Sequence, residues 1–352
     1  MNTDTIIPTI YPVTCHTDHV GVGSIFVAIP GLKEDGARYI SHAVNKGAQE
    51  IVVATGTVLS QDIVELLEKN RTQLCFADNP RAYLALASAR ACDNPAQKLK
   101  IIGITGTKGK TTTCFLVEHI LKSAGYTTAL LTTVLNRIVD TTLDAPMTTP
   151  QPDYLHLFLR QCVNASVEYV VMEVSAQALS FNRLNGILFD GLIFTNFEQD
   201  HLDYYQTMEK YFEAKAQLMA YRKPGAPVCI NADDPWISTL IGSYAYLCSF
   251  GITQNDANMH AHLIGDQKES INFGLCSENS ISTYTITSLI GRFNAYNCLA
   301  ATCLSLRLGI DSTIIAQALA RFRSVPGRME VYQLPNGAKA IIDYAHNPSS
   351  CQ

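Results

Sequence analysis

The sequence predicts an α/β protein, with a small N-terminal α/β domain followed by a central domain that is built on a parallel sheet. Three observations lead to this fold class. The chain has 352 residues, of which 47% are hydrophobic, so it can bury more than one core. Short apolar runs alternate with helical patterns, as they do in βαβ units. A glycine-rich run lies between a strand and a helix at residues 103–113, which is the context of a phosphate-binding loop, or P-loop.

The N-terminal domain is predicted over residues 1–97. Apolar runs with strand character lie at residues 24–29 and 50–54, and helical patterns follow them at residues 37–47 and 61–69. These elements are sufficient for a small α/β domain.

The central domain is predicted over residues 98–328. Ligands of parallel sheets bind beyond the carboxyl ends of the strands, so polar residues that follow the strands should converge there. The predicted strands are residues 100–105, 127–132, 169–174, 188–196 and 227–231. The polar residues that follow them are the P-loop, Glu173 to Ser175, Thr195 with Asn196, and Asp200 to Asp203.

Composition excludes several other classes of protein. The net charge is −5 and no basic run is present, so we expect no nucleic-acid partner. No stretch of about 18 consecutive apolar residues occurs, so we expect no membrane span. Eleven cysteines without a Cys-x-x-Cys pair indicate reduced thiols in a cytoplasmic protein. We expect a monomer.

The P-loop runs from Gly103 to Thr113. Its glycines let backbone N–H groups face an anion, and the helix N-terminus adds partial positive charge. Lys110 can then reach the outer phosphates of a nucleotide, and the hydroxyl of Thr111 can hold Mg²⁺. The first glycine lies one residue earlier than in the usual Walker spacing, so this is a variant loop. The alternative is a glycine-rich turn that binds nothing.

Two side chains beyond the P-loop point to a metal. Glu173 closes a buried strand, where a carboxylate is costly unless it is paired or metal-bound. Capping a neighbouring helix is the alternative for Glu173. His201 lies between Asp200 and Asp203, as in a metal-binding loop, although a lone histidine is more often a surface or packed residue.

Lys215 lies on the apolar face of a predicted helix, whereas Lys210 and Glu213 point outward. An ammonium group on that face must snorkel, pair or change its charge. We therefore weigh a snorkelling lysine against a functional, modified lysine near the nucleotide. The residues that share its stripe are Met208, Tyr211, Phe212, Leu218 and Met219.

Eight motifs in this order resemble those of the Mur ligases, from about Gly21 to His346. Within that family, the sequence is most similar to the members that add the third residue of the peptidoglycan stem peptide. The motifs are GITGTKGKTTT, MTTP, MEVSAQAL, FTNFEQDHLDYYQTMEKYFEAK, INADD, GRFNAYN, VPGRMEV and DYAHNP.

The resemblance implies an ATP-dependent amide ligase of peptidoglycan synthesis that uses ATP and Mg²⁺. ATP would phosphorylate a carboxylate of UDP-N-acetylmuramoyl-L-alanyl-D-glutamate, and the amine of diaminopimelate or lysine would displace the phosphate from the acyl phosphate. Two alternatives stay open. One is a folylpolyglutamate-type ligase, and the other is a truncated nucleotide-binding protein without ligase turnover.

The resemblance also implies site residues, motif by motif. Catalytic roles fall on Lys110, Lys215 and His201. Nucleotide contacts fall on Gly106, Thr107, Gly109, Lys110, Thr111, Thr112, Asn294, Asn297, Arg328, Asp343 and His346. Metal ligands fall on Thr111, Glu173, His201 and Lys215, the last as its carbamate. Substrate contacts fall on Thr148, Thr149, Ser175 and Arg183.

The sequence departs from the family pattern in its N-terminal half. His16-Thr17-Asp18 stands where the family has Asp-Ser-Arg, which puts the uridine contact in doubt. Phe181 stands where relatives often carry a polar substrate contact. Asp78-Asn79-Pro80-Arg81 resembles the diaminopimelate signature of the family, but it precedes the P-loop. We interpret it as a helix cap with proline in the first turn.

The family has a third, Rossmann-like domain, which is expected to begin near Arg328. Residues 329–352 would be a stub of that domain, so the chain is either a fragment or a truncated gene product. The stub is predicted to contain a hairpin from Met329 to Asp343 with Asn336-Gly337 at its turn.

Overall fold

The structure is a computed structural model that describes residues 7–31, 34–254, 257–264, 271–277, 280–286 and 289–345. The chain divides into two compact units. Unit 1 comprises Met1–Leu99, Pro150–Ser166 and Gln177–Leu188. Unit 2 comprises Lys100–Thr149, Val167–Ala176 and Phe189–Gln352.

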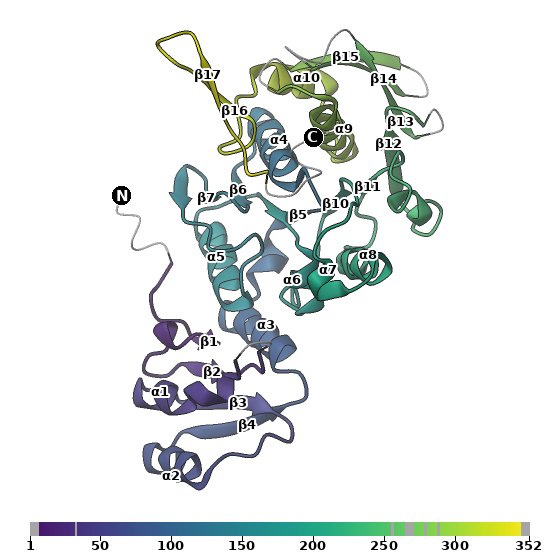
Figure 1. Ribbon diagram of the computed structural model, residues 1–352. Helices are drawn as coiled ribbons and strands as arrows, with labels where there is room; N and C mark the ends of the chain where they lie inside the picture. The colour runs from purple at the N-terminus through teal and green to yellow at the C-terminus, as the bar shows by residue number, and fades with distance from the viewer. Residues whose placement is uncertain are drawn as a thin grey trace. The chain divides into compact units, whose positions relative to one another are not determined.

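Unit 1 contains a four-stranded parallel sheet in the order β1-β2-β3-β4 (Figure 1). Its strands are β1 (Val13–Thr14), β2 (Ile25–Val27), β3 (Glu50–Ala54) and β4 (Gln73–Ala77). Its helices are α1 (Ile40–Asn45), α2 (Gln61–Asn70), α3 (Pro80–Ala91) and α5 (Pro152–Asn164), with α6 (Ala176–Ser180) beginning at the unit boundary. Short 3-10 turns are η2 (Thr17–His19), η3 (Gly36–Tyr39) and η4 (Pro95–Lys98).

Alternate residues along the strands of unit 1 pack into two separate hydrophobic cores. Ile51 and Val53 pack in one core, while Val52 between them packs in the other, because successive side chains of a strand point to opposite faces. The predicted strands and helices of this region are confirmed as β2, η3 with α1, β3 and α2. The predicted cap is also confirmed, since the side chain of Asn79 accepts from the backbone N–H of Ala82 at 3.1 Å.

Unit 2 is built on an eleven-stranded sheet in the order β15-β14-β13-β12-β11-β10-β5-β9-β6-β7-β8. Its strands are β5 (Lys100–Thr105), β6 (Thr128–Leu131), β7 (Asn136–Ile138), β8 (Thr141–Leu143), β9 (Tyr169–Glu173), β10 (Gly191–Phe194), β11 (Val228–Asn231), β12 (Leu247–Gly251), β13 (Met259–Ile264), β14 (Ile271–Ser277) and β15 (Ser280–Ile286). The five predicted strands are confirmed as β5, β6, β9, β10 and β11.

The predicted parallel sheet forms the centre of this sheet, and antiparallel strands extend it at both edges. From β13 to β6 every neighbouring pair is parallel. The β13-β14-β15 and β6-β7-β8 pairs are antiparallel. Antiparallel neighbours need only a short turn, so these additions carry no βαβ pattern that the sequence could reveal.

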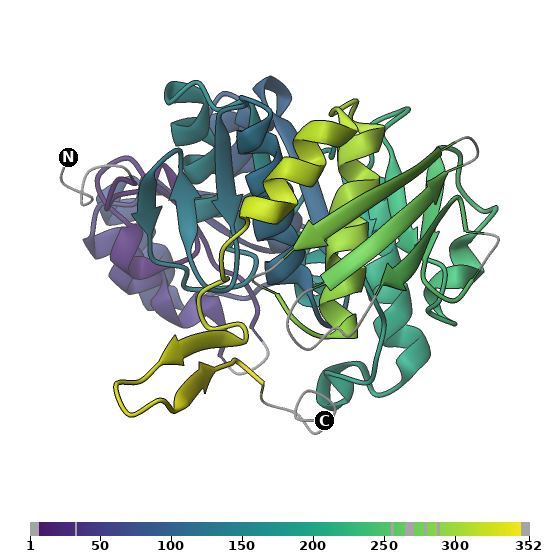
Figure 2. The same cartoon turned by 90° about the horizontal axis from the view of Figure 1, so that it is seen from above.

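Helices α4 (Lys110–Ser123), α9 (Arg292–Arg307) and α10 (Ser312–Arg321) pack on one another and on the sheet, as the view from above shows (Figure 2). Apolar residues of these helices and of the strands form one large core, in which Leu116, Leu299 and Ile315 are fully buried. The remaining helical segments of unit 2 are α7 (Leu202–Tyr205), α8 (Met208–Ala216), η5 (Gln217–Tyr221) and η6 (Ile237–Leu240).

The predicted C-terminal hairpin is confirmed. Strands β16 (Glu330–Gln333) and β17 (Lys339–Ile342) pair antiparallel as a separate two-stranded sheet. Gly337 has a φ of +83°, and Oδ1 of Asn336 accepts from the backbone N–H of Ala338 at 3.1 Å. The turn therefore uses the conformational freedom of glycine.

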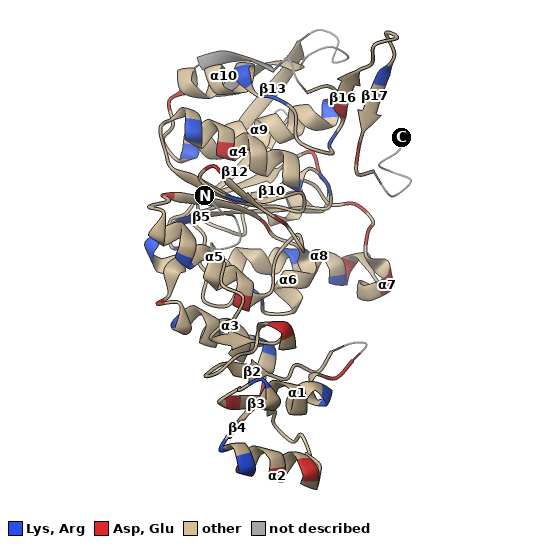
Figure 3. Ribbon diagram, turned by 90° about the vertical axis from the view of Figure 1, so that its left-hand side faces the viewer, with Lys and Arg blue, Asp and Glu red and all other residues tan. Residues whose placement is uncertain are grey.

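Basic and acidic residues are interspersed along the elements of each unit (Figure 3). Within the described ranges, no helix is long and apolar enough to cross a membrane. The nine cysteines that the structure describes are all free thiols.

Candidate active site

The P-loop connects β5 to α4 and lies closely against α9. Gly109 precedes α4 with a φ of +78°, which favours glycine. A Cβ atom at this position would lie 2.2 Å from Oδ1 of Asn297. That oxygen also accepts from the hydroxyl of Thr113 at 3.3 Å, and the amide nitrogen of Asn297 donates to Asn294 at 3.0 Å. Asn297 therefore lies beside the P-loop, and Asn294 is linked to it.

Two lysine side chains end at the same backbone oxygen of the P-loop. Nζ of Lys110 donates to the carbonyl oxygens of Gly106 and Thr107, at 3.0 Å and 2.8 Å. Nζ of Lys215 donates to the carbonyl oxygen of Gly106 at 2.8 Å. Lys215 is only 2% exposed, and its Nζ lies 4.7 Å from the centre of the Tyr211 ring. The snorkelling alternative is therefore wrong.

The two amines would repel each other if both were protonated. Both nitrogens bind one oxygen, so they lie no more than about 6 Å apart, and at an effective dielectric constant of about 20 the repulsion is about 3 kcal/mol. Burial holds the pKa of Lys215 well below its ordinary value, and Lys110 lowers it further. Burial also lowers the pKa of Lys110, which Glu173 partly offsets. The neutral amine is therefore the favoured form of Lys215.

Glu173 ends β9 and is completely buried, yet it is held by neutral groups. Its Oε1 accepts from the hydroxyl of Thr111 and from the backbone N–H of Thr133, both at 2.8 Å. Its Oε2 accepts from the hydroxyl of Thr133 at 3.1 Å. The sequence reasoning missed Thr133, although it directly follows a predicted strand at the carboxyl edge of the sheet.

Three of the four predicted substrate contacts lie around Glu173 and the end of β9. The hydroxyls of Thr148 and Thr133 lie within hydrogen-bond distance of each other, at 3.0 Å. The hydroxyl of Thr149 donates to the backbone oxygen of Glu173 at 2.9 Å and accepts from the backbone N–H of Ser175 at 3.0 Å. The structure thus brings Thr148, Thr149 and Ser175 to the end of β9.

Residues that follow β10 hold the backbone of the P-loop. Thr195 donates its hydroxyl to the carbonyl of Lys108 at 2.7 Å. The side chain of Asn196 accepts from the N–H of Lys108 at 2.8 Å and donates to its carbonyl at 3.0 Å. The ammonium of Lys108 pairs with Glu198 at 2.7 Å. The predicted convergence of these strand ends is confirmed.

Arg328 reaches the P-loop, whereas Asp343 does not. Nη2 of Arg328 donates to the hydroxyl oxygen of Thr111 at 3.3 Å. The carboxylate of Asp343 accepts from two backbone N–H groups beside its own hairpin, both at 2.7 Å. His346, another predicted nucleotide contact, lies outside the described residues. The remaining predicted contacts, Gly106, Thr107 and Thr112, lie in the loop and in the first turn of α4.

His201 directly precedes α7 and is half exposed. Its Nε2 lies 3.8 Å from the carboxylate of Asp200, and its ring centre lies 5.8 Å from that of Tyr211. Because Tyr211 also contacts Lys215, one aromatic ring links His201 to the buried lysine. Among the residues that the structure describes, no group of three or more His, Cys, Asp or Glu side chains is placed to hold a metal ion.

The residues at the P-loop nevertheless fit Mg²⁺ and a nucleotide that bind together. Thr111 and Glu173 place a hydroxyl and a carboxylate oxygen 2.8 Å apart. Mg²⁺ prefers such oxygens and is usually bound by one or two carboxylates together with substrate phosphates and water. Gly109 has no Cβ atom, so Asn297 can lie directly against the loop. The backbone N–H groups at the start of α4 are the donors that a phosphate needs.

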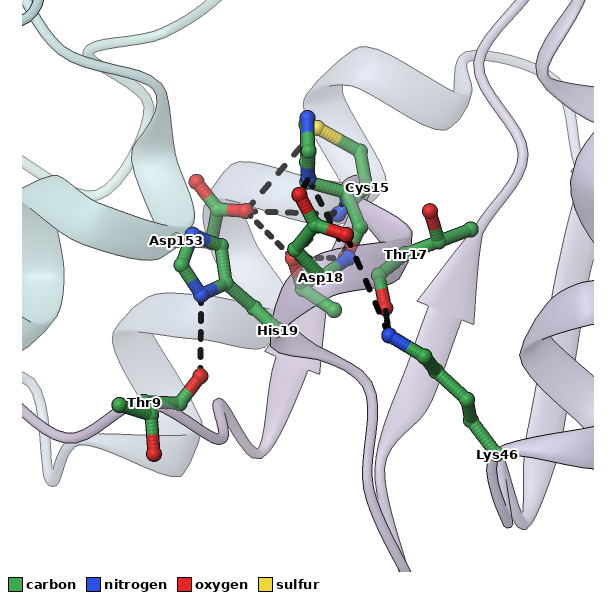
Figure 4. A network of polar contacts seen from close by, with 9 residues as sticks. Thr9, Cys15, Thr17, Asp18, His19, Lys46 and Asp153 are labelled. Atoms are coloured by element: carbon green, nitrogen blue, oxygen red, sulfur yellow. Dashed lines mark hydrogen bonds and ion pairs between the residues drawn. The ribbon is translucent and has the colours of Figure 1, made fainter.

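Arg183, the fourth predicted substrate contact, belongs to unit 1. It is 9% exposed, and its guanidinium lies 5.7 Å from the centre of the Phe181 ring. In the same unit, Asp153 accepts from the hydroxyl of Thr14 at 2.8 Å and from the backbone N–H of Cys15 at 3.3 Å (Figure 4).

The segment that departs from the family pattern forms the short turn η2. The ammonium of Lys46 donates to the backbone oxygen of Thr17 at 2.9 Å (Figure 4). The ring of His19 stacks on that of Tyr11, with the centres 4.0 Å apart. Lys46 is thus the cation that binds this turn.

Comparison with known proteins gives consistent matches along the chain. Residues 104–305 match the Mur ligase middle domain. The chain is 34% identical, over 98% of its length and 70% of the relative, to the UDP-N-acetylmuramoyl-L-alanyl-D-glutamate–2,6-diaminopimelate ligase of Bacillus licheniformis. The same-named protein of Geobacillus thermodenitrificans is also 34% identical, over 98% of this chain and 69% of the relative.

Solved structures match the fold. A structure of a UDP-N-acetylmuramoyl-L-alanyl-D-glutamate–2,6-diaminopimelate ligase has a TM-score of 0.78 at 25% identity, with 97% of this chain and 68% of that chain covered. The MurF ligase of Thermotoga maritima in complex with ADP has a TM-score of 0.66 at 20% identity, with 97% and 73% covered.

Proposed function

Because the chain belongs to the Mur ligase family of ATP-dependent amide ligases, we propose that it joins an amino acid to UDP-N-acetylmuramoyl-L-alanyl-D-glutamate in the cytoplasm. The observation that carries this proposal is the polar edge at the P-loop. There Lys110 and Lys215 share one carbonyl oxygen, while Thr111 and Glu173 form an oxygen pair. Diaminopimelate is the proposed amino acid because the matched relatives carry it in their names.

The first half-reaction transfers the γ-phosphoryl group of ATP to a substrate carboxylate. The backbone N–H groups at the start of α4 and the ammonium of Lys110 hold the phosphates. Thr111 and Glu173 would hold Mg²⁺, which neutralises negative charge on the transferring group. A carboxylate oxygen attacks phosphorus, the bond to the β-phosphate oxygen breaks, and an acyl phosphate and ADP result.

The second half-reaction forms the amide. The neutral amine of the incoming amino acid attacks the acyl carbon, the carbon–oxygen bond to phosphate breaks, and the amine loses a proton. Thr148, Thr149 and Ser175, which lie at the end of β9, are the proposed contacts to the muramoyl-dipeptide in unit 2. Arg183 is the proposed contact in unit 1.

Lys215 is proposed to act as its carbamate. A neutral amine can attack CO₂, with formation of a nitrogen–carbon bond and loss of one proton, and burial favours the neutral amine here. The product carries a negative charge and two oxygens, which suit a site that holds Mg²⁺. His201 is proposed to assist at the same ion from beyond the Tyr211 ring.

The function is tested with the purified chain, MgATP, UDP-muramoyl-dipeptide and either diaminopimelate or lysine. We expect ADP release that requires both the dipeptide and diaminopimelate, and a tripeptide product by mass spectrometry. Lys110→Ala should turn over much more slowly than the wild type. The substitution removes several kcal/mol of transition-state stabilisation, on the order of one oxyanion contact or more. Dihydrofolate with glutamate is the control pair. Product from that pair alone, or unchanged MgATP affinity and turnover in Lys110→Ala, would overturn the proposal.

A further inference from the structure

The first aspartate of the INADD motif, Asp233, is surrounded by hydrogen-bond donors. Its carboxylate accepts from the backbone N–H groups of residues 252–254, which follow β12, at 2.7–2.9 Å. Its Oδ2 also accepts from the hydroxyl of Tyr296 at 2.6 Å. Burial alone would raise the pKa of Asp233, but these donors lower it to about 2, so the carboxylate is charged at neutral pH. The proposed reaction assigns no step to this residue.

Asp233 lies on a path of hydrogen bonds that begins at the P-loop. Thr195 donates its hydroxyl to the carbonyl of Lys108, and its own backbone oxygen accepts from the side chain of Asn231 at 3.0 Å. The side chain of Asn231 accepts in turn from the backbone N–H of Asp233 at 3.0 Å. The first part of the path therefore crosses from the P-loop over the ends of β10 and β11.

The path returns to the P-loop through α9. Tyr296, which donates to Asp233, directly precedes Asn297 on this helix. Oδ1 of Asn297 accepts from the hydroxyl of Thr113 at 3.3 Å and lies against Gly109. The path therefore begins and ends within the P-loop, and the bond between Tyr296 and Asp233 is the step that joins α9 to it.

The start of α9 needs such an outside support. Gly291 is the N-cap of the helix and has no side chain that could bond the free backbone N–H groups of the first turn. The helix also meets the P-loop closely, since a Cβ atom at Gly109 would lie 2.2 Å from Oδ1 of Asn297. In such close packing, a small movement of the helix start displaces either the P-loop or the asparagine.

We propose that Asp233 is a positioning residue for the nucleotide, which acts through Tyr296 to fix the first turns of α9 against the P-loop. This inference rests on the proposed function, together with the nucleotide contacts that the family resemblance assigns to Asn294 and Asn297. A hydrogen bond from a hydroxyl to a charged carboxylate is short and strong, so it suits this purpose. The affinity for the nucleotide should therefore depend on Asp233, although its carboxylate bonds neither the P-loop nor the asparagines.

A purely local role for Asp233 gives different expectations. If the carboxylate only holds residues 252–254, its loss should lower thermal stability and leave the nucleotide affinity of the folded protein unchanged. Tyr296→Phe separates the two roles, because it breaks the bond to α9 and keeps the three bonds to the backbone N–H groups.

Two control variants come from the same unit. Tyr332→Phe removes another hydroxyl that donates to a carboxylate, that of Glu330 in the C-terminal hairpin, at 2.7 Å. Asp311→Ala removes the cap of α10, where the carboxylate accepts from the backbone N–H of Thr313 at 2.8 Å. The cap variant measures how far a general loss of stability affects nucleotide binding.

Calorimetry measures the Kd for MgADP and for UDP-muramoyl-dipeptide. We expect Tyr296→Phe to raise the Kd for MgADP about threefold to tenfold and Asp233→Asn about tenfold to thirtyfold, with the Kd for the dipeptide unchanged. The variant with both changes should match Asp233→Asn alone, because both changes break the same link. Thermal melting identifies a variant that fails to fold, and Tyr296→Phe carries the comparison if Asp233→Asn does.

Three results would overturn the inference. The first is an unchanged Kd for MgADP in Tyr296→Phe. The second is an equal rise in the Kd for the dipeptide. The third is an equal loss of MgADP affinity in Tyr332→Phe, or in Asp311→Ala at the same fall in Tm.

Hydrogen exchange provides a measurement that needs no ligand. In Tyr296→Phe we expect faster amide exchange at residues 292–297 and 106–113 than in the wild type. Failure of the proposed function has a separate signature, because the wild type would then not bind MgADP or the dipeptide. Hydrogen exchange decides the inference in that case as well. Faster exchange in the P-loop supports it, and a change confined to residues 252–254 overturns it.

Discussion

Replacing Lys215 with methionine should stabilise the protein and abolish its activity. Methionine has a similar length and no charge, so it fills the same buried space. Burial favours the neutral amine, so folding at neutral pH must remove the proton that Lys215 carries in the unfolded chain. Methionine avoids that cost and loses one hydrogen bond worth about 1 kcal/mol. The carbonyl of Gly106 stays satisfied because Lys110 still donates to it. The proton cost exceeds the hydrogen bond, so the balance is a gain in stability of at least about 1 kcal/mol, or roughly 2–4 °C in Tm for a unit of this size.

The activity loss has a different cause. A carbamate on Lys215 would supply negative charge beside the proposed Mg²⁺ site, and methionine cannot form one. We therefore expect added formate or acetate to restore part of the turnover in Lys215→Ala, where the shortened side chain leaves space. Lys210→Met is the matched control, because Lys210 is exposed on the same helix. Calorimetric melting and ADP release measure the two effects. Full activity in Lys215→Met, or a loss of 2 kcal/mol or more in stability, would refute this reasoning.

Two further predictions follow from other buried groups. Thr133→Val removes the hydroxyl that holds Oε2 of Glu173 and keeps the backbone N–H that holds Oε1. We expect the Mg²⁺ concentration needed for half-maximal ADP release to rise about tenfold, with unchanged MgATP saturation at high Mg²⁺. An unaltered Mg²⁺ dependence would contradict this prediction. Burial lowers the pKa of His156 to about 4, so the fold favours the neutral ring, and stability that is complete above pH 6.5 should fall by up to about 3 kcal/mol as the pH drops to 4. Urea unfolding measures the free energy of unfolding at pH 7.5 and at pH 5. The change in that free energy between the two pH values should be smaller for His156→Leu than for the wild type. Equal changes would rule out this histidine as the source of the pH dependence.

The parts of the fold that could be predicted from the sequence are those in which apolar residues recur at a regular local spacing. The strands that became β5, β6, β9, β10 and β11 are short apolar runs between helical patterns, and a buried parallel strand leaves that signature. The helix that carries Lys215 was placed by its apolar stripe, and the structure confirms that its amine is buried.

What sequence missed depends on pairing between strands or on contacts between distant residues. Strands β14 and β15 are antiparallel additions, and nothing local distinguishes them from exposed hairpins. Thr133 holds Glu173 from 40 residues away, and Arg81 meets Phe181 from 100 residues away. A threonine after a strand or an arginine in a first helical turn is too common to be singled out before the sheet order is known.

The way charges are compensated separates the candidate active site from an ordinary buried ion pair, and unit 2 contains both. Glu118 is 2% exposed and forms ion pairs with Arg137 and Lys122. Glu173 is equally buried but accepts only from hydroxyl and backbone N–H groups among the described residues. The amine of Lys215 likewise binds a carbonyl oxygen and an aromatic face instead of a carboxylate.

Neutral partners hold a charged group in place without cancelling its charge. A buried charge needs either a counter-ion or a full set of hydrogen bonds, and a lysine paired with Glu173 would supply the counter-ion. Such pairing would also leave less negative charge for a divalent cation and less positive charge for a phosphate. The geometry at Glu118 therefore suits a structural role. The geometry at Glu173 and at the two lysines suits a site whose opposite charges arrive with Mg²⁺ and ATP.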